Sequence, residues 1–359
     1  MESNTVGGAR ESYQASVIVV CTNELHHLLR CLPALLTQTH ASYEVVVVDN
    51  ASSDGSREYV QDLLESHSHL RIITNQDNLG YVGANNVGFA NSDAELLIVL
   101  NPDTEPEADW LSELVKAFDE PDVGLATSKI VMMYDRSRLN TCGNDMSVIS
   151  LVVCRGLGKP ATGFSEAADV AAVSGAAFAI RRSVLEKIGY FDSSFFIYYE
   201  DTELSLRARL AGYRCVYVPT SVVAHDYKFK FSTKKAFWQE RNRYYSILKI
   251  FDWRTIILLS PWFLLGDLVA FGYCALQSRQ HVFSKLRAYM WIIQHWGQIM
   301  ENRRRTQALR AVPDSHLLQS MVPEISAAGA TEGWLQQVVE KGLQPFLQLG
   351  STVSKQVSW

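Results

Sequence analysis

Acidic and amide side chains follow the apolar runs of this chain, at positions where such side chains can bind a ligand. The apolar run Leu96–Leu100 leads directly into Asn101, Pro102 and Asp103. Pro102 cannot continue a strand ladder, so the strand should end there and place Asp103 at its carboxyl end. A carboxylate at that edge of an open sheet can hold a hard cation, and the cation can hold a diphosphate. The alternative is a turn in which Asp103 caps the following helix.

Further acceptors and amides follow the earlier apolar runs, namely Asp49, Asn78 and the segment Thr22-Asn23-Glu24. These groups suit a nucleoside base, a ribose and a metal-bound diphosphate. Asp49 is equally explained as a turn residue, and Asn78 as a left-handed residue before Gly80. The loop after the first predicted strand has no glycine, and the chain has no GxxxxGK[ST] string. Both absences argue against a dinucleotide-binding fold and a P-loop.

Glu200 and Asp201 lie where an aromatic run, residues 195–199, meets a predicted helix. The dipole of that helix would by itself favour carboxylates at its N-terminus. The chemical alternative is a general base whose pKa is tuned by the neighbouring aromatic rings. The position of the two carboxylates is therefore compatible with either role.

Gly175 and His225 are the remaining candidates. Gly175 lies in the small, apolar segment 173–180, where a residue without a side chain would let the backbone approach a ligand closely. His225 follows a predicted strand and precedes Asp226. It is a candidate ligand for a metal or a diphosphate, with a purely structural histidine as the alternative.

Apolar runs alternate with helical patterns in the first third of the chain. The predicted strands span residues 16–21, 43–48, 70–73 and 96–100, and a helical pattern follows each of them. This alternation is typical of right-handed βαβ units and predicts an α/β fold with a mostly parallel central sheet. Residues 130–163 are irregular and contain several glycines, which predicts an insertion or a lid over the site.

The composition excludes some classes of function. The 359 residues are 47% hydrophobic and 20% charged, which suits one large or two modest globular domains. A net charge of −5 gives no reason to expect nucleic acid as a partner. The six cysteines form no CxxC pair and are expected to be reduced packing residues. The polar N-terminus lacks the apolar segment of a signal peptide, so we expect the catalytic domain in the cytosol.

The last third of the chain is basic and aromatic and includes a long apolar run. Residues 256–276 are numerous enough to cross a bilayer, but Pro261, Gly266 and Asp267 interrupt them. Basic residues flank both ends, so the charge asymmetry of a spanning helix is missing. An in-plane or re-entrant helix with lysines at anionic head groups is favoured. A core helix packed on the catalytic domain or on a second subunit is the alternative.

We expect four parts in the chain: a flexible N-terminus at 1–13, a catalytic domain at 14–230, a helical membrane-associating region at 231–311 and a tail at 312–359. In the tail, residues 334–343 are predicted to form a short amphipathic helix that Pro345 ends.

Seven short motifs follow one another in a characteristic order: Thr22-Asn23-Glu24, Asp49-Asn50, Asn78-Leu79-Gly80-Tyr81, Asn101-Pro102-Asp103, Ser174-Gly175-Ala176, Glu200-Asp201 and His225. This set resembles the inverting family-2 glycosyltransferases, which have the GT-A fold. It is particularly similar to the branch with bacterial rhamnosyltransferases of cell-surface polysaccharides. The resemblance spans about residues 14–230, and its strength lies in the order of the motifs rather than in any one of them.

The resemblance implies a role for each nucleotide-binding motif. Asp49 matches the residue that reads the imide of a pyrimidine base. Thr22-Asn23-Glu24 matches the loop around base and ribose, and Asn78 and Gly80 match the lining of the nucleotide pocket. Gly175 is expected to bring backbone close to the nucleotide sugar.

The resemblance also implies the chemical roles. Asp103 matches the last residue of the family's DxD motif, which binds Mg²⁺ or Mn²⁺ on the diphosphate, and His225 is our second metal candidate. Asn101 replaces the first Asp of that motif, which removes one negative charge. Asp201 matches the catalytic base, and Glu200 is its neighbour in the ED motif.

These roles imply transfer of one sugar, with a rhamnose-like deoxyhexose favoured, to a glycan or lipid-linked glycan in cell-surface polysaccharide synthesis. dTDP-rhamnose is the favoured donor, with UDP- or GDP-sugars as alternatives. A lipid-linked acceptor would place the enzyme at the cytoplasmic face of the membrane, as a peripheral or monotopic protein. A homodimer is a further partner to test.

Two other functions stay open. A nucleotidyltransferase usually has a glycine-rich basic loop after its first strand, and that loop is missing here. A membrane-bound sugar-nucleotide sensor or scaffold would not need both Asp103 and Asp201. The enzymatic interpretation requires that these two carboxylates converge on one anomeric carbon.

Overall fold

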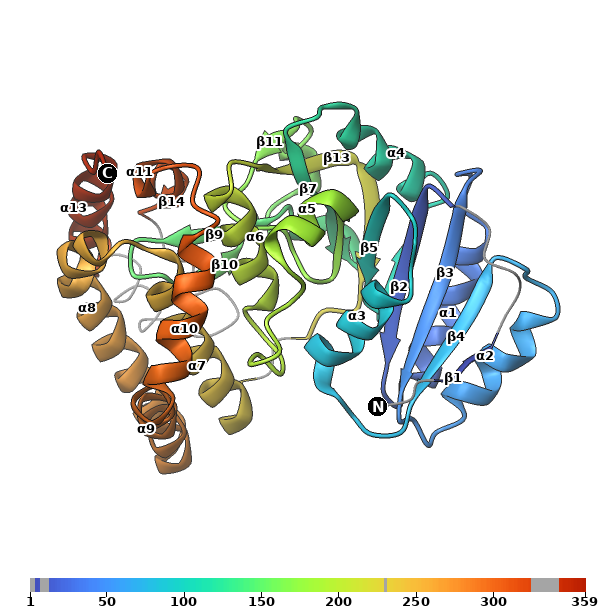
Figure 1. Ribbon diagram of the computed structural model, residues 1–359, viewed down its shortest axis with the longest axis horizontal. Helices are drawn as coiled ribbons and strands as arrows, with labels where there is room; N and C mark the ends of the chain where they lie inside the picture. The colour runs from blue at the N-terminus through green and yellow to red at the C-terminus, as the bar shows by residue number, and fades with distance from the viewer. Residues whose placement is uncertain (1–3, 7–12, 229–230, 324–341) are drawn as a thin grey trace.

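A large mixed β-sheet forms the centre of the molecule, and a group of C-terminal helices lies beside one end of it (Figure 1). The computed structural model describes residues 4–6, 13–228, 231–323 and 342–359. Of the predicted flexible N-terminus, the structure describes Asn4–Val6, which form strand β1, and Tyr13.

The first part of the sheet is parallel. It consists of β2 (Ala15–Cys21), β3 (Tyr43–Asn50), β4 (Leu70–Asn75) and β5 (Leu96–Leu100), connected through α1 (Leu25–Leu36), α2 (Ser56–Leu64) and α3 (Gly80–Ala90). These strands pair in the order β4-β3-β2-β5. Every residue of β3 and β5 is buried, because the sheet separates two apolar cores. The predicted α/β fold with a mostly parallel central sheet is confirmed.

The second part of the sheet is mixed. Its strands are β6 (Thr104–Pro106), β7 (Val123–Met132), β8 (Asp135–Thr141), β11 (Ala168–Asp169), β12 (Ala177–Arg181) and β13 (Arg214–His225). β12 lies antiparallel between β5 and β7, and β13 is parallel to β7. One end of each of the strands β5, β12 and β13 thereby comes close to the others, around residues 101, 176 and 225.

The prediction of an irregular segment at 130–163 is wrong for much of its length. Besides β7 and β8, it contains β9 (Asn144–Ser147) and β10 (Val152–Cys154). The glycines that suggested irregularity serve the turns between or after these strands, where Gly143, Gly156 and Gly158 have positive φ.

Three helices accompany the second part of the sheet: α4 (Trp110–Lys116), α5 (Arg182–Ile188) and α6 (Glu200–Leu210). α6 is buried along its whole length from Thr202 to Leu210. Even Arg207 and Arg209 are buried in this helix, and Arg207 pairs with Glu203. A helix so enclosed can hold its first residues in one fixed place.

The C-terminal region consists of α7 (Thr233–Ile250), α8 (Trp253–Gln277), α9 (Arg279–Gln294), α10 (Trp296–Gln307), α11 (Asp314–Leu318), β14 (Met321–Val322) and α13 (Gln344–Lys355). Tyr245 and Leu248 of α7 belong to the same apolar core as residues of the central sheet. All six cysteines are free, as predicted.

The predicted helix at 334–343 lies largely outside the described residues. Pro345 itself lies in the first turn of α13, the helix that the structure describes here. Proline is well tolerated there, since the first helical N–H groups have no partner within the helix.

α8 is the one helix among the described residues that is long and apolar enough to cross a membrane, by length and composition. Only 22% of its most apolar window is buried in the protein. Its Asp267 nevertheless points inward and pairs with Arg243 of α7. Lys285 of α9 lies 3.6 Å from the same carboxylate, so charge links all three helices.

The expectation that basic residues of this region reach lipid head groups is wrong for four of them. The side chains of Arg241, Arg243, Lys249 and Lys285 are buried. Arg243 and Lys285 pair with Glu240, and Lys249 pairs with Asp192 and Glu203. Burial of a charge requires such partners, so Arg243, Lys249 and Lys285 form ion pairs within the protein instead of binding lipid.

Candidate active site

Asp103 lies where strands β5 and β13 end. Beyond the last residue of β5, the Asn101 N–H donates to the Ala176 carbonyl at 2.9 Å. The chain then turns into β6, which pairs with the end of β13. The Asp226 N–H donates to the Asp103 carbonyl at 2.9 Å. Asp103 is therefore held between the carboxyl ends of β5 and β13.

His225 is the nearest ionisable partner of this carboxylate. Its Nε2 lies 3.3 Å from Asp103 Oδ1, and its Nδ1 lies 2.8 Å from Asn140 Oδ1. Because an amide oxygen only accepts, Nδ1 must hold the proton of this second contact. Burial alone would raise the pKa of Asp103, but the neighbouring His225 holds that pKa below its usual value.

The donor set fits a divalent cation. Asp103 Oδ1 and Asn101 Oδ1 are buried without a hydrogen-bond donor. Nε2 of His225 faces the same carboxylate oxygen, so Asp103 and His225 could both bind one cation placed between them. One carboxylate, one imidazole and one amide oxygen are ligands that Mg²⁺ or Mn²⁺ can accept.

Asp201 lies in the first turn of α6 and accepts several hydrogen bonds. Its Oδ2 accepts from the Gly175 N–H at 2.8 Å and from Asn144 Nδ2 at 3.4 Å, and its Oδ1 accepts from the Thr202 N–H at 2.6 Å. Burial still raises the pKa of Asp201, despite the opposing effect of these donors. The carboxylate is thus fixed in direction and has a greater affinity for a proton than an exposed Asp.

Glu200 is buried beside Asp201, and its Oε2 has no hydrogen-bond partner. Burial, and next the charge of Asp201, raise the pKa of Glu200 to about 8. Glu200 therefore keeps its proton at neutral pH, so the pair holds one negative charge rather than two.

Tyr81 lies near both parts of this site. We call Asp103 and His225 the metal side, and Glu200 and Asp201 the acid side. Its phenol donates to the Gly175 carbonyl at 2.7 Å. Burial, followed by the charges of Glu200, Asp201 and Asp103, raises the pKa of Tyr81 well above its usual value. All three carboxyl groups therefore lie within electrostatic reach of one phenol.

Hydrogen bonds connect the segment of Gly175 and Ala176 both to Asp201 and to Asn101. Asp201 accepts from the Gly175 N–H, while the next carbonyl, that of Ala176, accepts from Asn101 beside Asp103. A Cβ on Gly175 would lie 3.3 Å from Asp201 Oδ2 and 3.5 Å from the Tyr81 oxygen. A side chain at position 175 would thus crowd both groups.

The predicted base-reading residue has partners of its own. Asp49 is buried, and its Oδ2 lies 2.7 Å from Arg57 Nη2, while its Oδ1 accepts from the Ser52 N–H at 3.1 Å. Arg57 is about one third exposed. Both carboxylate oxygens of Asp49 thus already have partners within the protein.

Asn78 and Gly80 shape the neighbouring turn. Asn78 Oδ1 accepts from Asn50 Nδ2 at 2.9 Å and from the Gly80 N–H at 2.8 Å. Gly80 has φ +72°, and a Cβ there would come within 2.6 Å of the Phe196 ring. Only glycine combines this conformation with so close an approach.

The loop of Thr22, Asn23 and Glu24 is tied to the loop after β3. Asn50 Nδ2 donates to the Thr22 hydroxyl at 3.4 Å. Asn23 has φ +58°, and its Oδ1 accepts from the Ser53 N–H at 2.8 Å. Glu24 lies near His26 and His27, and ligand atoms of these three residues lie within 4.8 Å of one another. This second cluster is the alternative metal position among the described residues.

Sequence reasoning missed four residues around this site: Arg57, Tyr81, Asn140 and Asn144. Tyr81 stands in a motif that was recognised, directly after Gly80, so a signal for it existed. Asn140 and Asn144 lie in the segment predicted to be irregular, and nothing local marks them.

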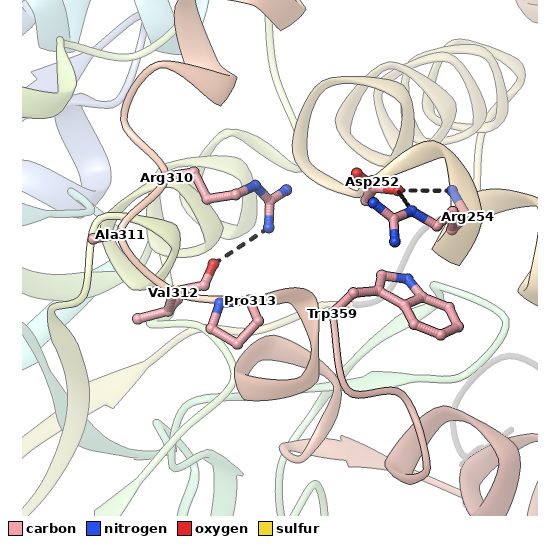
Figure 2. A pocket seen from close by; sticks show the side chains of 7 residues that line it. All are labelled: Asp252, Arg254, Arg310, Ala311, Val312, Pro313 and Trp359. Atoms are coloured by element: carbon pink, nitrogen blue, oxygen red, sulfur yellow. Dashed lines mark hydrogen bonds and ion pairs between the residues drawn. The ribbon is translucent and has the colours of Figure 1, made fainter.

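A hollow elsewhere on the molecule is not part of this site. It has a volume of about 370 Å³ and is lined by Asp252, Arg254, Arg310, Ala311, Val312, Pro313 and Trp359 (Figure 2). Its charged groups are already engaged, since Arg310 pairs with Asp314 and Arg254 with Asp252. None of the acidic residues of the candidate site lines it.

Large parts of this chain are similar to known proteins. Residues 16–189 match the family model described as Glycosyl transferase family 2. The chain is 26% identical over 262 residues to glycosyltransferase AglE of Haloferax volcanii, which covers 70% of this chain and 81% of AglE. It is 28% identical to an N-acetylglucosaminyl-diphospho-decaprenol L-rhamnosyltransferase of Mycobacterium tuberculosis, covering 58% of this chain and 75% of that protein.

The fold is also found among solved structures. The crystal structure of GalNAc-T7 with UDP, GalNAc and Mn²⁺ matches 61% of this chain and 44% of that chain, with a TM-score of 0.53 and 20% identity. Several other curated relatives are covered over about half their length or less. The predicted family, GT-A fold and glycosyltransferase class are confirmed. Residues 16–189 of this chain form a glycosyl transferase family 2 domain.

Proposed function

We propose that this enzyme transfers one hexosyl or deoxyhexosyl residue from a nucleotide-diphospho-sugar to a glycan or lipid-linked glycan, with inversion. One observation supports the proposal most strongly: the Gly175 N–H donates to Asp201, and the carbonyl of the next residue, Ala176, accepts from the N–H of Asn101, two residues before Asp103. A sugar bound there would have a metal-binding group near its leaving diphosphate and a carboxylate near its acceptor.

Asp103 and His225 would hold Mg²⁺ or Mn²⁺, with Asn101 supplying a neutral oxygen. When bound, the ion would act as a Lewis acid on the departing diphosphate, which requires no proton transfer. Asn140 orients the imidazole of His225 by accepting its Nδ1 proton. The Mn²⁺ and UDP in GalNAc-T7 support this choice of ion.

Asp201 would accept the proton of the acceptor hydroxyl while that oxygen attacks the anomeric carbon opposite the diphosphate. The bond from the acceptor oxygen forms as the bond to the diphosphate oxygen breaks, so a single displacement inverts the anomeric centre. The Gly175 N–H and Asn144 hold the carboxylate in direction, and its raised pKa increases its affinity for the proton.

We favour dTDP-L-rhamnose as the donor, because a relative of this chain is an L-rhamnosyltransferase. UDP- and GDP-sugars are the alternatives. Thermal unfolding with each nucleotide sugar, with and without Mn²⁺, separates these donors, because a ligand that binds only the folded state stabilises it. Stabilisation by no nucleotide sugar would contradict the proposal.

We also place the enzyme on the cytoplasmic face of a membrane. Exposed apolar residues form a stripe at helical spacing on α8 (Ile257, Leu264, Leu268) and another on α9 (Phe283, Leu286, Met290, Ile293). Because Asp267 pairs inside the protein, α8 can lie in the membrane plane with its apolar stripe in the lipid. Such a position would bring a lipid-linked acceptor to the catalytic domain.

Flotation with phosphatidylglycerol-containing vesicles tests this placement. The wild-type chain is expected to float with the vesicles, and the double variant Leu264→Asp/Leu268→Asp to remain at the bottom. Leu29→Asp is the matched control, since Leu29 is a similarly exposed leucine on α1. Equal flotation of both variants would contradict membrane binding through α8.

A further inference from the structure

The backbone directly before the acid pair has an unusual conformation. Tyr198 and Tyr199 have φ of +68° and +73°, so two adjacent residues with side chains occupy the left-handed region. This conformation is unfavourable for residues other than glycine and persists only where surrounding contacts impose it. Glu200 and Asp201 follow immediately, so the direction of their side chains depends on these two tyrosines.

Asn242 of α7 contacts the backbone of this segment. Its side chain is fully buried, and its Nδ2 donates to the carbonyls of Ile197 at 3.0 Å and Tyr198 at 2.6 Å. One amide group thus binds two successive carbonyls just before the acid pair. The Tyr199 phenol adds a bond to the Ser150 carbonyl at 2.5 Å.

The same segment is held from its other side by α3 and by α7 itself. The Val82 N–H donates to the Phe196 carbonyl at 3.4 Å, and Gly80 approaches the Phe196 ring. The Phe196 ring stacks on Trp238 of α7 at a centroid distance of 5.5 Å. Residues 196–199 therefore lie between the nucleotide-side helix α3 and the C-terminal helix α7.

We propose that Asn242 is a positioning residue: it holds Tyr198 and Tyr199 in the left-handed conformation that presents Glu200 and Asp201 to the reaction. This inference rests on the proposed role of Asp201 as the base. It assigns to α7, in the C-terminal region, a part in the chemical step. Asp103 and His225 do not contact Asn242, so donor binding should not depend on it.

The test compares Asn242→Ala with Gln307→Ala in the full-length chain. Gln307 is a matched control, because its Nε2 also donates to two successive carbonyls, those of Lys249 at 2.9 Å and Ile250 at 2.7 Å. These carbonyls lie at the far end of α7, away from the acid pair. Both variants lose the same kind of contact, so a general loss of stability should affect them alike.

Two readouts are measured. Amide hydrogen exchange of residues 196–205 should be faster in Asn242→Ala than in Gln307→Ala. Release of nucleoside diphosphate is followed with the sugar that the wild type consumes among dTDP-L-rhamnose, UDP-GalNAc and GDP-mannose. Asn242→Ala should lower kcat by about 10- to 100-fold with little change in donor KM, since a small displacement of a catalytic group has effects of that size. Gln307→Ala should retain wild-type kcat.

Adding Tyr198→Gly to Asn242→Ala should restore much of the lost kcat, because glycine adopts a positive φ without strain. If Asn242→Ala alone does not fold, the double variant should fold and turn over, and an inactive double variant would contradict the proposal. Equal exchange and equal kcat in Asn242→Ala and Gln307→Ala would overturn it. The Asp201→Asn variant in the same assay separates the proposed base from the proposed role of Asn242. An active Asp201→Asn variant would overturn the assignment of Asp201 as the base. An inactive Asp201→Asn variant together with an active Asn242→Ala variant would overturn only the role of Asn242.

Discussion

The metal side and the acid side of the candidate site are built in different ways. Asp103 lies between β5 and β6, His225 is the last residue of β13, and the pairing of β6 with β13 brings them together. Glu200 and Asp201 begin a buried helix after two left-handed tyrosines, and contacts from distant segments hold them. A site at strand ends is thus determined largely by the sheet, whereas the acid pair depends on α7 and on the Gly175 segment as well.

The largest expected effect concerns the acid side. Asp201→Asn removes the proposed proton acceptor, so kcat should fall by about 10²- to 10⁴-fold. Donor affinity, measured by calorimetry with Mn²⁺, should remain close to wild type, because the metal side is intact. Turnover at the wild-type rate would show that the base lies elsewhere.

The second effect concerns the metal side. Asp103→Ala removes the only carboxylate of the predicted ion site, so Mn²⁺-dependent binding of a nucleoside diphosphate should become undetectable by calorimetry. Asp135→Ala is a suitable control, because Asp135 is an exposed aspartate on β8. Unchanged diphosphate binding in Asp103→Ala would move the metal away from β5.

A smaller effect is expected for Asn140, which orients the proposed metal ligand His225 but is not itself a proposed ligand. Asn140→Ala leaves His225 free to change its tautomer and ring angle, so Mn²⁺ affinity should fall by about 10- to 100-fold. Titration with Mn²⁺ followed by electron paramagnetic resonance measures this change. An unaltered affinity would mean that Asn140 does not orient His225.

The last effect is on stability and its dependence on pH rather than on activity or binding. Since the folded-state pKa of Glu200 is raised to about 8, the folded protein keeps a proton that the unfolded chain loses above its ordinary pKa. The free energy of unfolding should therefore fall as pH rises from about 4.5 to 8, by at most about 1.4 kcal/mol per pH unit from this group. Glu200→Gln should flatten that slope in urea titrations. The same slope in both proteins would contradict a neutral, buried Glu200.

The difference between the two sides also explains how far the sequence could predict them. The boundaries of Leu96–Leu100 and the place of Asp103 follow from an apolar run ended by Pro102, which is local information. The candidate metal ligand His225 is equally visible as the last residue of a strand. The family and the α/β class followed from the order of such motifs.

The remaining features depend on contacts between residues far apart in the chain. Asn242 lies 44 positions after Tyr198, and no periodicity indicates that its amide binds that carbonyl. The burial of Arg243 and Lys285 depends on Asp267 and Glu240, so a basic stretch that suggested lipid contact became an internal ion network. The sequence predicted a nucleotide-binding role for Asp49, but it did not predict the ion pair between Asp49 and Arg57.

The most direct test is a crystal structure of the Asp201→Asn variant with Mn²⁺ and the donor that stabilises it best. We predict the ion between Asp103 and His225, the diphosphate on that ion, and the anomeric carbon facing position 201 across the Gly175 segment. An ion bound by Glu24, His26 and His27, or a sugar directed away from the start of α6, would contradict this arrangement.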